Sequence, residues 1–176
     1  MPRAKAARWT VPERALGTWF VLHTKSRQEK LLADTLSTMG IAAYLPLVRQ
    51  PRYYGRHKLS VELPLFAGYL FLRGSIDDAY SADRTNRVAK IIPVADQQRL
   101  DTELQNIQLA LERGAELDLC QALTKGTPVE VRSGPFRGLQ GVVEDRVKPN
   151  RLLLQVEMLG RAVSLEVDGA LLERLV

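Results

Sequence analysis

The chain has 176 residues, of which 45% are hydrophobic, and it contains a single cysteine, Cys120. This length and composition fit one medium or two small globular domains, and the lone cysteine excludes an intramolecular disulfide framework. No apolar run approaches the roughly 20 residues that span a bilayer, and the basic N-terminus lacks the apolar core of a secretory signal, so we expect a soluble intracellular protein with no membrane partner.

The net charge of +5 is distributed unevenly along the chain. Residues 1–110 carry 16 Lys and Arg against 10 Asp and Glu, whereas residues 111–176 carry 9 against 10. A polyanion is therefore expected to meet the N-terminal two-thirds, although a basic surface that serves only solubility remains an alternative.

The first part of the chain alternates strand and helix patterns after a basic arm, residues 1–17, which we expect to be disordered. Capping boxes are predicted at Ser26 with Glu29 and at Ser75 with Asp78. The predicted elements are a strand at 19–22, a helix ending at Gly40, a strand at 42–48, a hairpin at 50–63 with a basic tip, a strand at 69–72, a short helix after Ser75 and a strand at 88–93. This order indicates an α+β domain with a mostly antiparallel sheet and helices packed on it.

The segment from Pro64 to Leu72 (PLFAGYLFL) has more large apolar residues than a strand buried on one face requires. Gly68 permits a bend or a close backbone approach between Phe66 and Tyr69. Either the segment is a central strand covered on both faces, or part of it forms a docking surface. We assign Leu70 and Leu72 to the sheet core.

Residues 96–113 form an amphipathic helix pattern, in which Leu100, Leu104, Ile107 and Leu111 share a stripe. We expect residues 114–124 to be a linker. From Lys125 onward, short alternating strands around Val129, Val142, Leu154 and Val163 are separated by turn signals such as 148–150. So many short strands in about 50 residues bury a core by curling into a small barrel.

The sequence shows no active site, and we expect neither an enzyme nor a bound metal or cofactor. His23 and His57 lie outside recognisable ligand or triad spacings, and Cys120 has no neighbouring histidine. Basic residues gather instead in three clusters: Lys25, Arg27 and Lys30; Arg49, Arg52, Arg56 and Lys58, interleaved with Tyr53 and Tyr54; and Arg84, Arg87 and Lys90. Basic side chains beside exposed aromatic rings suit phosphate contact and base stacking, although a solvated hairpin with its tyrosines tucked against the sheet is the alternative.

These residues together resemble the NusG family of transcription elongation factors, including its specialised RfaH-like members. In the first domain the resemblance rests on Trp19-Phe20-Val21, on Glu29 and Leu36, and above all on the segment from Pro64 to Phe71. In the second domain it rests on Gly134-Pro135-Phe136, Gly141 and Leu159-Gly160-Arg161-Ala162, which resemble a KOW domain.

The resemblance implies an NGN domain over residues 18–113 and an SH3-like KOW β-barrel over 125–176, in a monomer of the bacterial cytosol or nucleoid. The NGN domain would dock on the clamp helices of the largest catalytic RNA polymerase subunit through Phe66, Ala67 and Tyr69, together with His23. Upstream or non-template DNA would be contacted by Lys25, Arg27, Lys30, Arg84 and Arg87. Phe136, Leu159 and Arg161 would contact the KOW partner, a small-subunit ribosomal protein or the termination factor Rho.

Three departures from the family pattern affect these expectations. Ala67 replaces a proline before Tyr69, and Thr35 and Thr38 replace the polar and basic residues with which RfaH-like proteins read a DNA element. Leu159 replaces an aromatic residue, which removes stacking from the partner loop. We favour a specialised antiterminator. The alternatives are a housekeeping NusG-type factor and a ribosome-associated KOW protein that binds RNA. The last is disfavoured because residues 111–176 carry no excess of basic residues.

Overall fold

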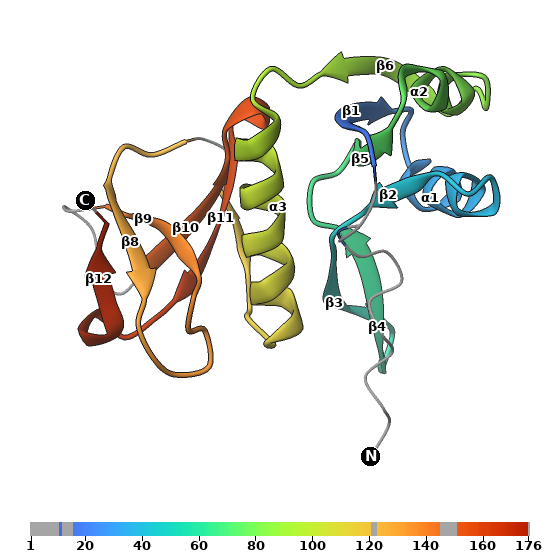
Figure 1. The fold of residues 1–176 in the computed structure, drawn as a ribbon. Helices are drawn as coiled ribbons and strands as arrows, with labels where there is room; N and C mark the ends of the chain where they lie inside the picture. The colour runs from blue at the N-terminus through green and yellow to red at the C-terminus, as the bar shows by residue number, and fades with distance from the viewer. Residues whose placement is uncertain (1–10, 12–15, 121–122, 145–150, 176) are drawn as a thin grey trace. The chain divides into compact units, whose positions relative to one another are not determined.

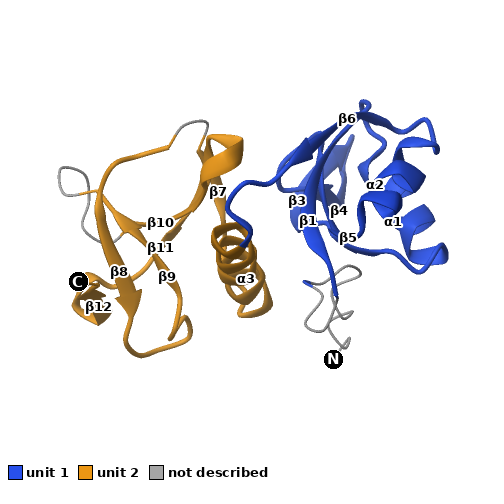
Figure 2. Ribbon diagram, turned by 45° about the horizontal axis from the view of Figure 1, so that its top comes forward, with its two compact units in different colours: residues 1–97 blue, residues 98–176 orange. Residues whose placement is uncertain are grey.

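The computed structural model describes residues 11, 16–120, 123–144 and 151–175. The chain divides into two compact units, Met1–Gln97 and Gln98–Val176 (Figure 2). The predicted basic arm at 1–17, apart from Val11, Leu16 and Gly17, and the predicted turn at 148–150 lie outside the described residues. Where the chain is described, no helix is long and apolar enough to cross a membrane.

The first unit has the predicted α+β order (Figure 1). Its described residues form an antiparallel sheet with strand order β2-β5-β1-β6 and a separate β3–β4 hairpin. The elements are β1 (Thr18–Thr24), α1 (Glu29–Thr38), β2 (Ala42–Tyr44), β3 (Leu47–Tyr54), β4 (His57–Pro64), β5 (Tyr69–Gly74), α2 (Ile76–Asp83) and β6 (Val88–Pro93).

The strand predicted at 42–48 is two strands, β2 and β3, separated by Leu45 and Pro46. Proline has no backbone N–H, so Pro46 cannot donate to a strand ladder. Its carbonyl instead accepts a hydrogen bond from the Leu65 amide at 2.9 Å, which ties the two ends of the hairpin together. This break lets the hairpin leave the sheet that β2 belongs to.

The core of the first unit lies between the sheet and its helices. Alternation along β1 and β5 places Leu22, Leu70 and Leu72 on one face, and all three side chains are fully buried. Both α1 and α2 pack on this face, which we call the first face (Figure 2). The helices contribute Leu32, Ala33, Leu36 and Ala82 to the same core. The assignment of Leu70 and Leu72 to the sheet core is confirmed.

The second unit contains a small antiparallel β domain, whose described strands have the order β12-β8-β9-β10-β11-β7. Its elements are α3 (Gln97–Glu112, which begins one residue before the boundary), β7 (Asp118–Cys120), β8 (Thr127–Val131), β9 (Gln140–Val143), β10 (Arg151–Val156), η1 (Glu157–Leu159), β11 (Arg161–Glu166), η2 (Gly169–Leu171) and β12 (Leu172–Arg174). The four alternating strands predicted from Lys125 onward are present as β8 to β11.

Two features of the second unit differ from the sequence-based organisation. Residues 114–124, expected as a linker, contain β7, which pairs with the edge strand β11 from Asp118 to Cys120. Three residues are too few to show alternation, so the free edge of β11 and not the local pattern decides this strand. Helix α3 was expected in the first domain, but the compact units divide before nearly all of it.

Only one of the two predicted capping boxes forms. The Ser75 hydroxyl accepts from the Asp78 amide at 3.1 Å and the Asp78 carboxylate accepts from the Ser75 amide at 2.9 Å. At α1 the N-cap is Gln28 and no side chain caps the helix, so the Ser26–Glu29 prediction is wrong. The Glu29 carboxylate instead accepts a hydrogen bond from the Gly68 amide.

This contrast gives a matched pair of substitutions. Ser75→Ala is expected to lower the free energy of unfolding by about 0.5–2 kcal/mol, because it removes the N-cap acceptor of α2. Ser26→Ala, which changes a residue that caps nothing, is expected to change it by less than about 0.5 kcal/mol. Urea unfolding followed by tryptophan fluorescence measures both, and equal losses would contradict the assigned caps.

Candidate functional site

The segment from Pro64 to Leu72 turns sharply from the end of β4 into β5. The Tyr69 amide donates to the Phe66 carbonyl at 3.1 Å, and Gly68 has φ = +86°. This left-handed conformation is strained for residues with a Cβ atom, which explains the glycine. The bend predicted at Gly68 is confirmed, and it leaves Ala67 exposed at the outside of the turn.

A buried carboxylate of α1 holds this turn in place. Glu29 is 7% exposed, and its Oε1 accepts a hydrogen bond from the Gly68 amide at 2.8 Å. The Gly68 carbonyl in turn accepts from the Thr24 amide of β1, also at 2.8 Å. Both polar backbone groups of Gly68 are therefore bonded to neighbouring elements, which fixes the turn against β1 and α1.

Removing this acceptor is expected to loosen the turn. Glu29→Ala should lower the free energy of unfolding by about 1–3 kcal/mol, because it leaves the Gly68 amide without its acceptor. Glu29→Gln retains an acceptor oxygen of the same reach and should cost less than half as much. Amide hydrogen exchange at Gly68 measures the same effect locally. Unchanged protection in Glu29→Ala would contradict the assigned role.

The opposite side of the sheet, which we call the second face, carries three rows of side chains set by strand register. The rows are Trp19 beside Arg73 and Ala42; Val21 beside Phe71, Tyr44 and Ile92; and His23 beside Tyr69 and Lys90. The first two rows are mainly apolar or aromatic, and the third is aromatic and basic. The second face therefore changes from an apolar centre to a polar margin along β1.

Aromatic contacts organise this face. The Phe71 ring lies 6.5 Å from the Tyr44 ring, and the Phe66 ring meets it edge-on at 6.4 Å. At the margin, the His23 and Tyr69 rings stack with their centroids 5.2 Å apart. Val21 and Phe71 are fully buried, whereas His23 and Lys90 are exposed and Tyr69 is half-buried. The accessible part of the face is therefore its margin.

The four residues assigned to polymerase docking are only partly brought together. His23 and Tyr69 are cross-strand neighbours in direct contact, and a Cβ atom at position 68 would lie 3.6 Å from the same His23 ring. Phe66, in contrast, is 1% exposed, so its ring supports Phe71 and is not presented at the surface.

Sequence reasoning did not assign Trp19, Tyr44 and Phe71 to this site. Counting in twos from His23 and Tyr69 places Trp19 and Phe71 on the same face. Placing Tyr44 on this face requires the β2–β5 pairing, which no local sequence pattern indicates.

Three of the five predicted nucleic-acid residues lie where β1 ends and β6 begins. The Lys25 amide donates to the Arg87 carbonyl at 2.9 Å, and the Arg87 guanidinium bonds to the Gln28 side chain. Arg27, with φ = +59°, lies in the same connection from β1 to α1. Two clusters about 60 residues apart in sequence thus form one basic patch, defined here as Lys25, Arg27 and Arg87.

The other two predicted residues, Arg84 and Lys30, already have hydrogen-bond partners within the first unit. The Arg84 guanidinium donates to the Ser81 hydroxyl at 3.2 Å, and the Lys30 ammonium donates to the Glu62 carbonyl. Lys30 therefore fastens the base of the β3–β4 hairpin to α1, and it is less available for a phosphate than Lys25.

In the β domain, the predicted partner residues lie in two connections. Phe136 belongs to the β8–β9 connection, and Leu159 and Arg161 border the β10–β11 connection. All three residues are half-buried.

Helix α3 makes polar contacts with both of these connections. Arg113 donates to the carbonyls of Pro135 and Arg137, on either side of Phe136, at 3.1 and 2.6 Å. Glu103 accepts from the Glu157 amide at 2.9 Å in the other connection. These bonds account for the grouping of α3 with the β domain. In the described part of the chain, no group of His, Cys, Asp and Glu residues is arranged to hold a metal ion.

Comparison with known proteins then identifies the family. The family model of NusG, described as transcription termination factor nusG, matches residues 17–108, more than half of the chain. The chain belongs to the NusG family. This family comprises transcription factors that bind RNA polymerase and have no catalytic activity of their own. The matched residues of this NusG-family chain extend from β1 through most of α3, and the β domain lies beyond them.

Among solved structures, the chain is similar to one of the MjSpt4:Spt5 complex in conformation B. The two chains are 18% identical, the match covers 89% of this chain and 96% of that chain, and the TM-score is 0.30. No curated protein sequence matches the chain. The match over residues 17–108 confirms the resemblance at the level of the NusG family, and the strands, helices and antiparallel sheets of the chain agree with the predicted α+β class.

Proposed function

We propose that this NusG-family chain is an elongation and antitermination factor that docks on the clamp helices of the largest catalytic RNA polymerase subunit. The observation that carries the proposal is the margin of the second face, where the exposed His23 and half-buried Tyr69 stack beside Lys90. An aromatic anchor beside an apolar centre and a polar rim is the arrangement that receives an amphipathic helix.

The four assigned docking residues have different roles in this proposal. Tyr69 and His23 contact the helix directly, and Ala67 borders them at the outside of the turn. Phe66 acts from beneath, because its ring packs edge-on against Phe71 and holds the centre of the face. Lys90 joins the site as the cross-strand neighbour of His23 and supplies the positive charge of the rim.

We further propose that the basic patch of Lys25, Arg27 and Arg87, extended by Arg84, faces upstream or non-template DNA. The end of β1, the connection to α1 and the start of β6 meet at this patch. Guanidinium and ammonium groups on one surface can form charge-assisted hydrogen bonds with phosphates. Such contacts position the protein without reading bases. Lys30 contributes through its charge, since its ammonium is already bonded at the hairpin base.

The β domain is proposed to recruit a partner protein through Phe136, Leu159 and Arg161. Its part of the chain has no excess of basic residues, which favours a protein such as Rho or a small-subunit ribosomal protein over RNA. A housekeeping role that couples polymerase to Rho or to the ribosome is the alternative. In vitro transcription with Rho separates the two, because an antiterminator increases read-through whereas a housekeeping factor supports termination.

The docking proposal is tested by binding to core RNA polymerase free of nucleic acid. Tyr69→Ala and His23→Ala are each expected to weaken binding about tenfold or more, as substitution of interface anchors does. Tyr80→Ala is the matched control, because Tyr80 is 51% exposed on α2, which packs on the first face. Equal binding by the wild type and Tyr69→Ala would overturn the proposal.

A further inference from the structure

The β3–β4 hairpin is an arm that the proposed docking does not use. Its strands pair continuously from Leu47 with Pro64 to Tyr54 with His57. Every residue from 49 to 60 is exposed, and Figure 1 shows the ribbon extending away from β1, β2 and β5. Packing against the rest of the first unit therefore does not explain which side chains the arm carries.

A tight turn fixes the geometry of the tip. Gly55 and Arg56 connect the strands, with Gly55 at φ = +62°, as in a two-residue hairpin that places glycine first. The register is therefore defined, and Tyr53 and Tyr54, as successive residues, point to opposite faces of the ribbon. Lys58 lies opposite Tyr53, and Arg52 lies on the same face as Tyr54.

The charge of the arm has one sign over its outer two-thirds. Residues 50–61 contain Arg52, Arg56 and Lys58 and no acidic residue. The acid nearest the base, Glu62, lies 3.6 Å from the guanidinium of Arg49. A polyanion approaching the tip therefore meets three cations and no carboxylate among residues 50–61.

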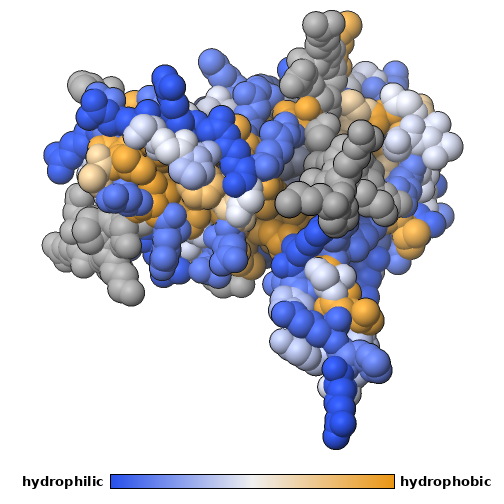
Figure 3. Space-filling model, turned by 90° about the horizontal axis from the view of Figure 1, so that it is seen from below, coloured by the Kyte–Doolittle hydropathy of each residue, from blue (hydrophilic) through white to orange (hydrophobic). Residues whose placement is uncertain are grey.

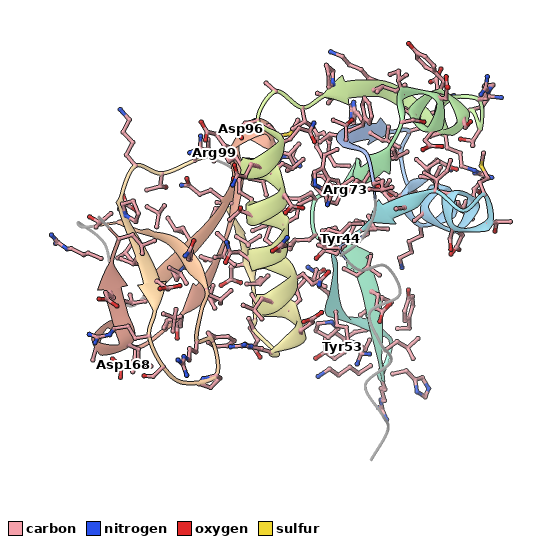
Figure 4. All side chains as sticks on the ribbon, in the orientation of Figure 1. Tyr44, Tyr53, Arg73, Asp96, Arg99 and Asp168 are labelled. Atoms are coloured by element: carbon pink, nitrogen blue, oxygen red, sulfur yellow. The ribbon has the colours of Figure 1, made fainter. Side chains whose placement is uncertain are left out.

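The two tyrosines are the second, independent observation. Tyr53 is 68% exposed and Tyr54 is 60% exposed, so the alternative in which they are tucked against the sheet is wrong. Figure 4 shows Tyr53 on the hairpin, apart from Tyr44 and Arg73 of the sheet. On the face drawn in Figure 3, hydrophilic residues predominate and smaller groups of apolar residues lie among them. Exposed rings beside cations are the elements of a stacking platform for nucleobases.

These features favour an unpaired strand over a duplex. Bases within a duplex have both ring faces covered by their neighbours, so tyrosines find no stacking partner there. Bases of a single strand offer free ring faces, and Arg52, Arg56 and Lys58 lie close enough to contact the intervening phosphates. We propose that the β3–β4 hairpin binds single-stranded nucleic acid, with Tyr53 and Tyr54 stacking on bases.

The test uses the full chain and a fluorescein-labelled oligo(dT) of about 12 nucleotides, a length within the range that single-strand modules occupy. Binding is measured by fluorescence anisotropy. Tyr53→Ala and Tyr54→Ala are each expected to weaken binding at least about fivefold, while Tyr53→Phe and Tyr54→Phe stay within about twofold, because phenylalanine retains the stacking ring. Tyr80→Ala, which changes a tyrosine that is 51% exposed on α2, should leave binding unchanged.

Salt dependence tests the cations. If the three cations each contact a phosphate, a plot of the logarithm of the association constant against the logarithm of the salt concentration should have a slope of about −2. The Arg52→Gln, Arg56→Gln and Lys58→Gln triple variant should lose most of this slope, whereas Lys125→Gln, an exposed lysine of the β domain, should retain it. Parallel titrations with oligo(U) distinguish RNA from DNA as the source of the strand.

Two results would overturn the proposal: unchanged binding by the Tyr53→Ala and Tyr54→Ala double variant, or equal affinity for the strand annealed to oligo(dA). Either would mean electrostatic attraction without stacking. The outcome is independent of polymerase docking, because Tyr69→Ala should retain oligonucleotide binding and the double tyrosine variant should retain binding to nucleic-acid-free polymerase. Both tyrosines are exposed, so the variants should fold, which far-UV circular dichroism verifies.

Discussion

Leu70→Ala is expected to lower the free energy of unfolding of the first unit by about 2–5 kcal/mol. Leu70 is fully buried in β5, where it packs in a core with Leu22 of β1 and Leu36 of α1. The substitution removes buried methyl groups and leaves a cavity between the sheet and helix α1. Tryptophan fluorescence during urea unfolding reports this loss, because both tryptophans, Trp9 and Trp19, belong to residues 1–97.

Leu59→Ala is the matched control for Leu70→Ala. Leu59 is a leucine of the same unit but is 54% exposed on the hairpin. Its replacement is expected to change the free energy of unfolding by less than about 0.5 kcal/mol. Comparable losses in both variants would contradict the position of the core between the first face and α1.

Gly141→Ala is expected to destabilise the β domain by about 1–3 kcal/mol, in the range of overpacked cores. A Cβ atom at Gly141 would lie 2.5 Å from the Leu153 carbonyl oxygen and 2.9 Å from the Leu152 Cδ1 atom. The first of these is backbone, so β9 must move away from β10 to accept a side chain. The tyrosines and tryptophans all lie in residues 1–97, so amide hydrogen exchange of β10 is the appropriate measurement.

Gln140→Ala, in the adjacent position of β9, is the control for this prediction. Gln140 is exposed, and its replacement should leave exchange in β10 unchanged. Gly141→Ala should also leave the tryptophan transition of the first unit in place. If exchange in β10 does not increase in Gly141→Ala, the close approach of β9 and β10 is not the reason for glycine here.

Local patterns predicted the strands and helices well where one pattern had one interpretation. The alternation of Leu152, Leu154 and Val156, and the helical spacing of Leu32 and Leu36, correspond to buried faces in the structure. Ser26 and Glu29 had two interpretations. The spacing alone fits a capping box, but the Gly68 amide competes for the same carboxylate, and that amide is 39 residues away in sequence.

The candidate surfaces were predictable to different degrees. The segment from Pro64 to Leu72 indicated the family and the region that we propose for docking, but the sequence did not show that Phe66 is buried while Ala67 is exposed. The exposure of Tyr53 and Tyr54 was likewise undecided, because the sequence allowed them to pack on the sheet. Strand β7 and the joining of Lys25 with Arg87 depend on neighbours distant in the chain.

The sequence by itself determined the α+β class, the small C-terminal β domain and the NusG family, because periodicity, turn residues and the PLFAGYLFL segment are local properties of the chain. The tertiary structure alone decided which side chains share a surface. Strand pairing set His23 beside Tyr69 and Lys90, the Pro46 break released the hairpin from the sheet, and Glu29 fixed the turn at Gly68. Such pairings depend on the register and packing of segments remote in sequence, which local patterns do not specify.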